Sequence, residues 1–358
     1  MSQLITESDI IVDVPYCASS FLMHRMIYDG KKAFSKNYPP RLYRGRKNVD
    51  MVYTSDDLEK SLKRQIEEST ADGKTAIALS GGIDSAIMAR FMPKGSKSYT
   101  FKCIVPGKKV EDETEQAARY AEECGLKHEI IEIYWEDALD YSPLLMTHKG
   151  APIHSIEFQI YKACAKAKND GFKRIIFGES ADNNYGGMSK LVEGIWLFGE
   201  YVDRYSYVKP YHVLKDYRMV LEPFIKHTDV KGYVDPHEHC RNEFFREAMG
   251  TYNNPAETAG IEMICPYANT YMACDMDFER IRAGEGKYLI REIFKRLYPG
   301  WDMPQKLPMP RPMNEWMANW QGPLRSEFWP NCTQNMTGDQ KWLVWSLEKF
   351  LNIIEEKV

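Results

Sequence analysis

The segment Thr75-Ala-Ile-Ala-Leu79, followed by Ser80-Gly-Gly-Ile-Asp-Ser85, joins a short apolar run to a glycine-rich turn. A short apolar run that ends at a turn is typical of a buried strand in a parallel sheet. Residues 84–91 then predict a helix that stops before Pro93. This order places the turn at the carboxyl end of a strand, where open α/β sheets bind ligands.

The same alternation of strands and helices continues along the chain. A helix is predicted at 56–66, strands at 98–105, 128–134 and 173–177, and helices at 111–124, 136–146 and 156–168. Strands that alternate with helices predict an α/β fold, an open parallel sheet with helices on both faces. Beyond about residue 190 the strand signal fades, and helices are expected at 241–249, 272–282, 288–297 and 342–356. The second half is therefore expected to be a mainly helical C-terminal region.

The chain is expected to divide near residue 55. Residues 1–55 predict an irregular N-terminal extension, because 38–47 is basic and interrupted by prolines. Residues 56–358 predict one domain, with a nucleotide-binding part at about 70–190 and a helical part at about 191–358.

The composition of the chain argues against several classes of binding partner. The 358 residues are 44% hydrophobic and 27% charged, with a net charge of -4, so no general attraction to nucleic acid or anionic membranes is expected. No apolar run approaches the roughly 18 residues of a membrane span, and the polar N-terminus is unlike a signal peptide. The eight cysteines are scattered with no CxxC pair, which indicates reduced thiols and a cytoplasmic location.

The glycine-rich turn has the chemistry of a phosphate site. The first N–H groups of a helix lack internal partners and carry the positive end of its dipole. Gly81 and Gly82 let the backbone approach a phosphate closely, and the hydroxyls of Ser80 and Ser85 add donors. Asp84 would repel a phosphate unless it holds Mg²⁺ that bridges nucleotide oxygens. The alternative is a turn of small residues with an N-capping Ser or Asp.

Ser80-Gly-Gly-Ile-Asp-Ser85 resembles the PP-loop of the N-type ATP pyrophosphatases, which include asparagine, GMP and NAD synthetases and several tRNA-modifying enzymes. The resemblance implies an adenine nucleotide alpha hydrolase-like fold. It also implies cleavage of ATP between its α and β phosphates and activation of a carbonyl oxygen as an adenylate. The ATP and pyrophosphate site is expected to comprise Leu79, Ser80, Gly81, Gly82, Asp84, Ser85, Phe101 and Gly178.

A second motif indicates which branch of these enzymes the chain resembles. Gly178-Glu-Ser-Ala-Asp-Asn-Asn-Tyr-Gly-Gly187 resembles the GEGxDExFGGY segment in the synthetase domain of asparagine synthetase B-type enzymes. Ser180 replaces a glycine, Asn183 a glutamate and Tyr185 a phenylalanine. Both loops would leave the carboxyl ends of neighbouring parallel strands. Asp84 and Asp182 are therefore expected to share one Mg²⁺.

The C-terminal half resembles the same family in three places. Glu262-Met-Ile-Cys-Pro-Tyr267 is similar to ExRxPFLD, Lys287-Tyr-Leu-Ile-Arg291 to the KxxLR helix, and Lys306 occupies the place of a later lysine. Lys287 and Lys306 are expected to stabilise the charge that accumulates when pyrophosphate leaves. An attacking amine must lose a proton, so Glu179 is expected to act as the base with Glu262 as its partner.

The departures from the family leave the substrates open. Enzymes of this type begin with a glutaminase domain, for which residues 1–55 are too few, so the expected nitrogen source is free ammonia, a separate glutaminase or another amine. His154 and Ser155 stand where an acidic or small polar pair is expected, so the small-molecule carboxylate stays unidentified. Two rivals remain: a PP-loop sulfur transferase acting on tRNA, and a catalytically inactive nucleotide-binding or docking protein.

Overall fold

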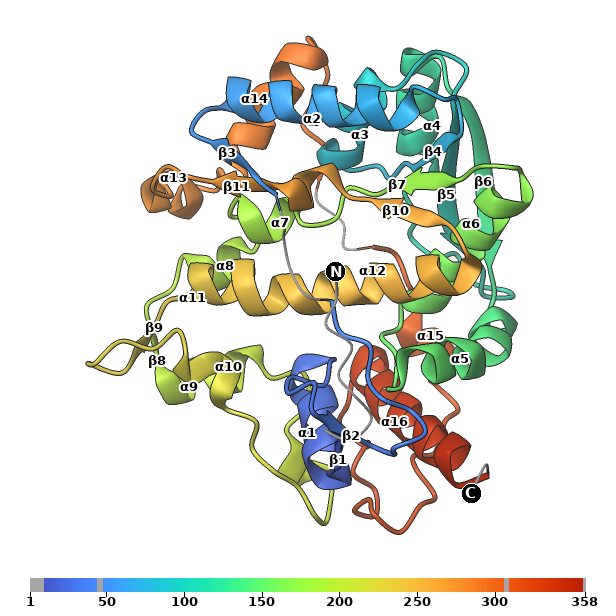
Figure 1. The fold of residues 1–358 in the computed structure, drawn as a ribbon, viewed down its shortest axis with the longest axis vertical. Coiled ribbons are helices and arrows are strands. Elements are labelled where there is room, and N and C mark those ends of the chain that lie inside the picture. The colour runs from blue at the N-terminus through green and yellow to red at the C-terminus, as the bar shows by residue number, and fades with distance from the viewer. Residues whose placement is uncertain (1–9, 44–47, 306–308, 357–358) are drawn as a thin grey trace.

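The computed structural model describes residues 10–43, 48–305 and 309–356. At its centre is a parallel sheet of five strands in the order β10-β7-β4-β5-β6 (Figure 1). The strands are β4 (Thr75–Ala78), β5 (Lys97–Cys103), β6 (Lys127–Ile133), β7 (Arg174–Ile176) and β10 (Glu262–Ile264). The predicted open parallel sheet is confirmed.

Strand β4 lies inside the sheet, which explains its apolar sequence. All four of its residues are buried, and it pairs in parallel with β5 on one side and with β7 on the other. Ile77 is in register with Ile176, the last residue of β7. Because β4 and β7 end at nearly the same level, the loops that follow them leave the same edge of the sheet together.

Helices cover both faces of the sheet (Figure 1). One face carries α2 (Ser55–Thr70), α3 (Ile83–Phe91), α4 (Thr114–Cys124) and α14 (Tyr288–Leu297). The other carries α6 (Glu157–Asn169) and α12 (Phe245–Ala259), and α5 (Trp135–Lys149) packs against these two helices farther from the sheet. Helix α2 illustrates the cause, since Leu58, Leu62 and Ile66 share one face and are all buried.

Strand β10 corrects the expectation that strands end near residue 190. Its three residues pair in parallel with β7, and the Glu262 N–H donates to the Lys173 carbonyl at 2.9 Å. A three-residue strand that begins with a charged side chain has too little periodicity to be recognised alone. The helix predicted at 272–282 is likewise wrong at its start, because β11 (Thr270–Met272) is a strand and α13 (Phe278–Arg282) is the only helical part.

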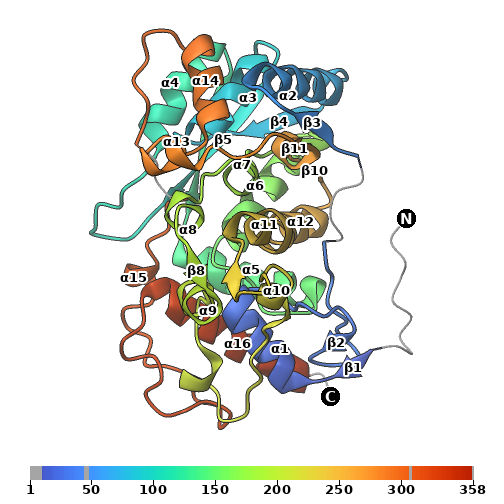
Figure 2. The same ribbon diagram turned by 90° about the vertical axis from the view of Figure 1, so that its left-hand side faces the viewer.

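The N-terminal segment is not irregular throughout, which corrects a second expectation. Helix α1 (Val14–His24) begins where the Asp13 side chain accepts the Tyr16 N–H at 3.1 Å, and it packs against α16 (Gly338–Glu356) (Figures 1 and 2). The nine residues from Tyr16 to His24 are all buried. A helix buried on every side has no amphipathic period, so its sequence lacks the usual signal. The division of the chain near residue 55 stays a prediction.

Many of the remaining elements lie in a second, largely helical layer on the far side of α12 from the sheet, whereas β3 and α7 lie on its sheet side (Figure 2). The remaining elements are β1 (Ile11–Val12), β2 (Lys32–Ala33), β3 (Asp50–Val52), α7 (Ala181–Asn184), α8 (Ser189–Val192), β8 (Trp196–Leu197), α9 (Phe198–Tyr205), η2 (Pro210–His212), α10 (Glu222–Ile225), β9 (Tyr233–Val234), α11 (Pro236–His239), η3 (Cys240–Phe244), η4 (Pro266–Asn269) and α15 (Met313–Trp316). The C-terminal half is mainly helical, as predicted. Within the described ranges, no helix has both the length and the apolar character to cross a membrane.

Candidate active site

A cavity of about 500 Å³ opens at the carboxyl ends of β4 and β7. Its wall is formed by the loops that follow these strands, by α12 and by the start of α14. A cavity of this size accommodates a small molecule. The predicted nucleotide residues that line it are Leu79, Ser80, Gly82, Asp84, Ser85, Phe101 and Gly178. Gly81 does not line the cavity.

The loop from Ser80 to Ser85 is held by its own hydroxyl groups. The Ser80 N–H donates to Ser85 Oγ at 3.0 Å, the two Oγ atoms are 2.9 Å apart, and the Gly82 N–H donates to Ser80 Oγ at 3.2 Å. Gly82 caps α3 without a side-chain bond. A Cβ on Gly81 would meet Glu113 Cβ at 3.0 Å, so this glycine lets α4 approach the loop. The loop is therefore a preformed turn at a helix N-terminus, which suits a phosphate.

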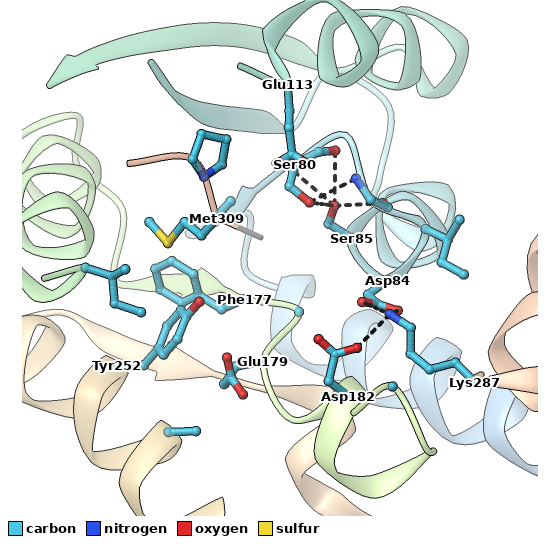
Figure 3. Close-up of a pocket in the computed structure, with 18 of the residues that line it drawn as sticks. Ser80, Asp84, Ser85, Glu113, Phe177, Glu179, Asp182, Tyr252, Lys287 and Met309 are labelled. Atoms are coloured by element: carbon cyan, nitrogen blue, oxygen red, sulfur yellow. Dashed lines mark hydrogen bonds and ion pairs between the residues drawn. The ribbon is translucent and has the colours of Figure 1, made fainter. Parts of the chain in front are cut away.

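Asp84 and Asp182 converge, although 98 positions separate them in the sequence. Asp84 lies in the first turn of α3 and Asp182 in α7. The Lys287 Nζ lies between them, 2.9 and 2.7 Å from the two oxygens of Asp84 and 3.0 Å from Asp182 Oδ1 (Figure 3). The predicted meeting of the two loops is therefore present in the geometry.

Lys287 is buried and offsets part of the negative charge of the two carboxylates. Burial lowers its pKa, but Asp84 and Asp182 outweigh burial and hold the pKa above its ordinary value. Its backbone is left-handed, with φ of 58°, immediately before α14. The sequence predicts that Lys287 faces the departing phosphate, whereas the structure places it against the predicted metal ligands.

The pair Gly186-Gly187 shapes the Asp182 side of this site. Gly186 has φ of 75°, and a Cβ there would meet Ile281 Cδ1 at 2.8 Å. A Cβ on Gly187 would lie 2.0 Å from Asp182 Oδ1. The loop therefore needs glycine at both positions to bring Asp182 to its place.

The two carboxylates fit a magnesium ion carried by a nucleotide. Carboxylate oxygens are ligands that Mg²⁺ prefers, and the ion usually takes one or two carboxylates together with substrate phosphates. The described residues contain no group of three or more histidine, cysteine or acidic side chains that could hold a metal. An ion held by Asp84 and Asp182 would thus need phosphate oxygens to complete its shell.

Glu179 lies beside these residues in the same cavity wall (Figure 3). Burial raises its pKa to about 7, although the Ser180 N–H donates to its Oε1 at 2.7 Å and opposes the rise. Tyr252 of α12 faces it, and burial followed by the Glu179 charge raises the pKa of Tyr252 well above its ordinary value. A carboxyl group that titrates near neutral pH can take up and release protons.

Glu262 does not join Glu179, which corrects the expected pairing. Glu262 begins β10, where it is in register with Arg174 at the start of β7. It therefore lies at the amino end of the strands, is exposed, and does not line the cavity. Lys306 lies outside the described residues, so its catalytic assignment stays a prediction.

Two residues that depart from the family motif, Ser180 and Asn183, lie in different surroundings. Ser180, in place of glycine, has φ of 76°, and its Oγ lies 3.3 Å from Met249 Sδ. The position thus requires the left-handed backbone that explains the glycine of the motif. Asn183, in place of glutamate, is buried, and its amide has no hydrogen-bond partner among the described residues. Neither change displaces Asp182 from Asp84.

Several cavity residues were not predicted from the sequence. Glu113 faces the phosphate loop, and burial raises its pKa to about 7. Tyr252 and Glu247 come from α12, and Arg25 from the end of α1. The acid next to the helix at 114–124 could have drawn attention to Glu113, but no motif marks the other three.

Comparison with known proteins identifies a family. Residues 54–328 match the model of the asparagine synthase family. A stretch of 72 residues is 31% identical to an NH(3)-dependent NAD(+) synthetase from Alkaliphilus metalliredigens (strain QYMF), spanning 20% of this chain and 29% of that protein's length.

Two solved structures resemble the chain more weakly. The NMN synthetase from Francisella tularensis has 13% identity and a TM-score of 0.27, covering 72% of this chain and 99% of that one. The NH3-dependent NAD synthetase from Campylobacter jejuni subsp. jejuni NCTC 11168, in complex with the nitrate ion, has 13% identity and a TM-score of 0.26, covering 72% and 100%. At these TM-scores neither likeness bears on function.

Proposed function

Because the chain belongs to the asparagine synthase family, we propose that it is an ATP-dependent carbon–nitrogen ligase that forms an amide. In the first step, a substrate carboxylate oxygen attacks the α-phosphate of ATP. The bond to the β-phosphate breaks, and pyrophosphate leaves. In the second step, ammonia or an amine attacks the acyl carbon, AMP leaves, and the nitrogen loses a proton. The products are an amide, AMP and pyrophosphate.

The convergence of two distant loops on one cavity supports this proposal most strongly. The PP-loop-like turn supplies Asp84, the second motif supplies Asp182 and Glu179, and all three line the same cavity. Either motif alone could be a turn with capping acids. Their meeting at the carboxyl edge of a parallel sheet is the expected geometry of a nucleotide site.

The phosphate loop is assigned to ATP. Backbone N–H groups at the start of α3 would receive the pyrophosphate part, with Ser80 and Ser85 as additional donors. Leu79 and Phe101, which line the same cavity, would contact the adenosine. Asp84 and Asp182 would hold Mg²⁺, which supplies positive charge to the phosphate oxygens when bound.

Two lysines are assigned to the charge that develops as pyrophosphate leaves. Lys287 keeps its charge, since two carboxylates lie within 3.0 Å of its Nζ. Lys306 is assigned the same task and the stabilisation of the tetrahedral intermediate on the strength of the family resemblance. A fixed cation is most effective in a site from which water is excluded.

Glu179 is the proposed base of the second step. Its pKa of about 7 means that roughly half of the molecules carry the carboxylate at neutral pH. A base whose pKa is close to the working pH combines availability with proton affinity. The nitrogen donor is proposed to be free ammonia, ammonia from a separate glutaminase, or another amine.

The sulfur-transferase alternative has less support. A nucleophilic cysteine needs an accessible thiol with a lowered pKa. Cys103, which ends β5, is buried with its thiol 3.3 Å from the Pro310 carbonyl, and burial raises its pKa to about 12. The alternative of a catalytically inactive protein is supported by the two departures from the family motif, Ser180 and Asn183. A measurement of turnover distinguishes it from the ligase.

The test is carboxylate-dependent release of pyrophosphate. The protein would be supplied with Mg²⁺, ATP, an ammonium salt and a panel of small carboxylic acids, and amide products would be identified by mass. We expect release with some acids and an amide of matching mass. ATP binding without turnover across the panel, with simple amines also tested, would favour the inactive protein instead. Transfer of sulfur to RNA would favour the other alternative.

A further inference from the structure

The ammonium group of Lys287 lies where a cation shared by two carboxylates would lie (Figure 3). Its Nζ is 2.9 and 2.7 Å from the two oxygens of Asp84 and 3.0 Å from Asp182 Oδ1. The Lys287 side chain is 9% exposed, whereas those of Asp84 and Asp182 are 20% and 33% exposed. The lysine is therefore the most enclosed of the three groups, and both carboxylates stay accessible from the cavity that they line.

The start of α14 is fixed against the loop that carries Asp182. A Cβ on Gly286 would lie 3.1 Å from the Gly186 carbonyl oxygen, so a side chain at 286 would crowd this approach. The Arg291 Nε donates to the Gly286 carbonyl at 2.7 Å, and the Arg291 N–H donates to the Lys287 carbonyl at 2.9 Å. Lys287 itself has φ of 58°, a left-handed conformation that lysine rarely adopts. A residue held in such a conformation by its surroundings is a common feature of functional sites.

A divalent ion and the Lys287 ammonium compete for the space between the carboxylates. Mg²⁺ binds oxygen at about 2.1 Å, so an ion on the oxygens that Lys287 contacts would lie no more than about 5 Å from its Nζ. Like charges at this distance repel strongly where water is largely excluded. Metal binding at Asp84 and Asp182 therefore requires that the ammonium moves away or that further negative charge enters the site.

The charge balance of the site indicates the source of that negative charge. The two carboxylates and the ammonium leave one net negative charge. A divalent ion alone would turn it into one net positive charge. Within the described ranges, no third acidic, histidine or cysteine side chain joins the pair in a group that could hold a metal. The phosphates of a nucleotide would supply both the missing charge and the missing ligands.

We propose that Lys287 makes the binding of a divalent metal at Asp84 and Asp182 conditional on the nucleotide. The ammonium holds the two carboxylates together and excludes a free divalent ion, so the metal enters only with the phosphates that accompany it. In this role Lys287 acts through the carboxylates, as a positioning residue. The inference rests on the proposed function and concerns the order of binding: the metal and the nucleotide bind together, and the metal does not bind first.

The first test uses the unaltered protein, with Mn²⁺ in place of Mg²⁺ because electron paramagnetic resonance detects the free ion. Without nucleotide, the unaltered protein should bind Mn²⁺ no more tightly than Asp84→Asn does. With a non-hydrolysable ATP analogue, the unaltered protein should bind Mn²⁺ more tightly than the variant. Binding of Mn²⁺ without nucleotide that depends on Asp84 would overturn the inference.

Replacement of Lys287 should create the metal site that the lysine excludes. Lys287→Met removes the charge and keeps most of the side-chain length. Without nucleotide, this variant should bind Mn²⁺ about 10-fold or more tightly than the unaltered protein, because two carboxylates have lost the cation that they share. Lys287→Arg keeps the charge and should show no gain. Addition of Asp182→Asn to Lys287→Met should remove the gain, which would assign the bound ion to the carboxylate pair.

The matched control is Lys166→Met. Lys166 Nζ also lies between two carboxylates, 3.1 Å from Glu129 and 2.6 Å from Asp170, but it is 36% exposed, lies away from the cavity, and shares Glu129 with Lys97. This variant should gain no Mn²⁺ binding. Thermal unfolding gives a second measurement, since an ion that binds the folded protein stabilises it. Mg²⁺ should raise the unfolding temperature of Lys287→Met more than that of the unaltered protein or of the control.

The outcomes separate this inference from the proposed function. Absence of a gain in folded Lys287→Met, or an equal gain in the control, overturns the inference even if the unaltered protein releases pyrophosphate. A gain that depends on Asp182, without pyrophosphate release from any acid, supports the inference and counts against the ligase.

Discussion

The phosphate end of the cavity and its remote end use the same kinds of charged side chain, but they gather them differently. At the phosphate end, Asp84 and Asp182 each lie in the first turn of a helix that follows a strand of the sheet after a short loop. At the remote end, Arg25, His154 and Glu247 come from three segments with no common motif. The difference teaches that the proposed chemistry is carried by short local segments, whereas the wall at the remote end of the cavity depends on the packing of whole layers.

This comparison predicts two kinds of response to mutation. Changes at the phosphate end should lower turnover by the same factor for every acid, because ATP is common to all. Changes at the remote end should alter the ranking of the acids. A variant at one end that both lowered turnover for every acid and changed the ranking of the acids would show that the two ends do not act independently.

The largest effect is expected from the carboxylate pair. Asp84→Asn and Asp182→Asn should each lower pyrophosphate release by about 10²–10³-fold or more, since each removes a ligand of the proposed Mg²⁺ and charge stabilisation in the site. Chelation of Mg²⁺ should abolish the same release. Release would be measured for several acids in turn.

The matched control for this pair is Asp56→Asn, whose carboxylate is 86% exposed and pairs with Arg296 far from the cavity. Near-normal turnover in either active-site variant would refute the metal assignment. A loss that differed between acids would break the separation of the two ends.

Glu179→Gln should have the next largest effect. Amide formation should fall by about 10²-fold, the usual range for loss of a general base, while pyrophosphate release in the first turnover persists. In the unaltered protein, only the deprotonated carboxylate accepts a proton, so the rate of amide formation should rise with pH through about 7. The variant should lose this rise.

Glu262→Gln provides the control, because Glu262 lies at the opposite edge of the sheet. Its pH profile should match that of the unaltered protein. An equal loss in both variants would restore the pairing of Glu179 with Glu262 that the structure rejects.

A smaller effect is expected from Gly187→Ala. The added Cβ would lie 2.0 Å from Asp182 Oδ1, so the carboxylate must move. We expect turnover to fall measurably for all acids and the free energy of unfolding to fall by about 1–3 kcal/mol. Gly199→Ala is the control, because a Cβ at that position would meet no atom within 4 Å. Equal turnover and equal stability of the two variants would show that the position of Asp182 does not depend on glycine at 187.

The smallest effect is expected from Ser180→Gly. Glycine relieves the left-handed backbone at φ of 76°, so the free energy of unfolding should rise by about 1 kcal/mol, with little change in turnover. Ser180→Ala keeps the unfavourable φ and loses the contact with Met249, so it should not stabilise. Urea unfolding compares the two. Stabilisation by alanine would mean that the hydroxyl, and not the backbone, is unfavourable here.

Much of the fold could be predicted because its signals are local. The apolar run at Thr75–Ala78 needs burial on both faces, and Gly125 ends α4 in a left-handed turn at φ of 66°. Helix α1 and strand β10 were not predicted. Helix α1 is buried on nearly all sides and strand β10 is three residues long, so neither has a period that can be recognised.

The sequence by itself determined the parallel sheet and the two loops that carry Asp84, Asp182 and Glu179, because strand, turn and helix signals lie within a few residues of one another. Only the tertiary structure decided that Lys287 lies between the carboxylates, that Glu262 lies at the wrong edge, and that Arg25 reaches the cavity. These placements depend on which distant surfaces bury each other. That free energy is shared by whole helices, so no short stretch of residues records it.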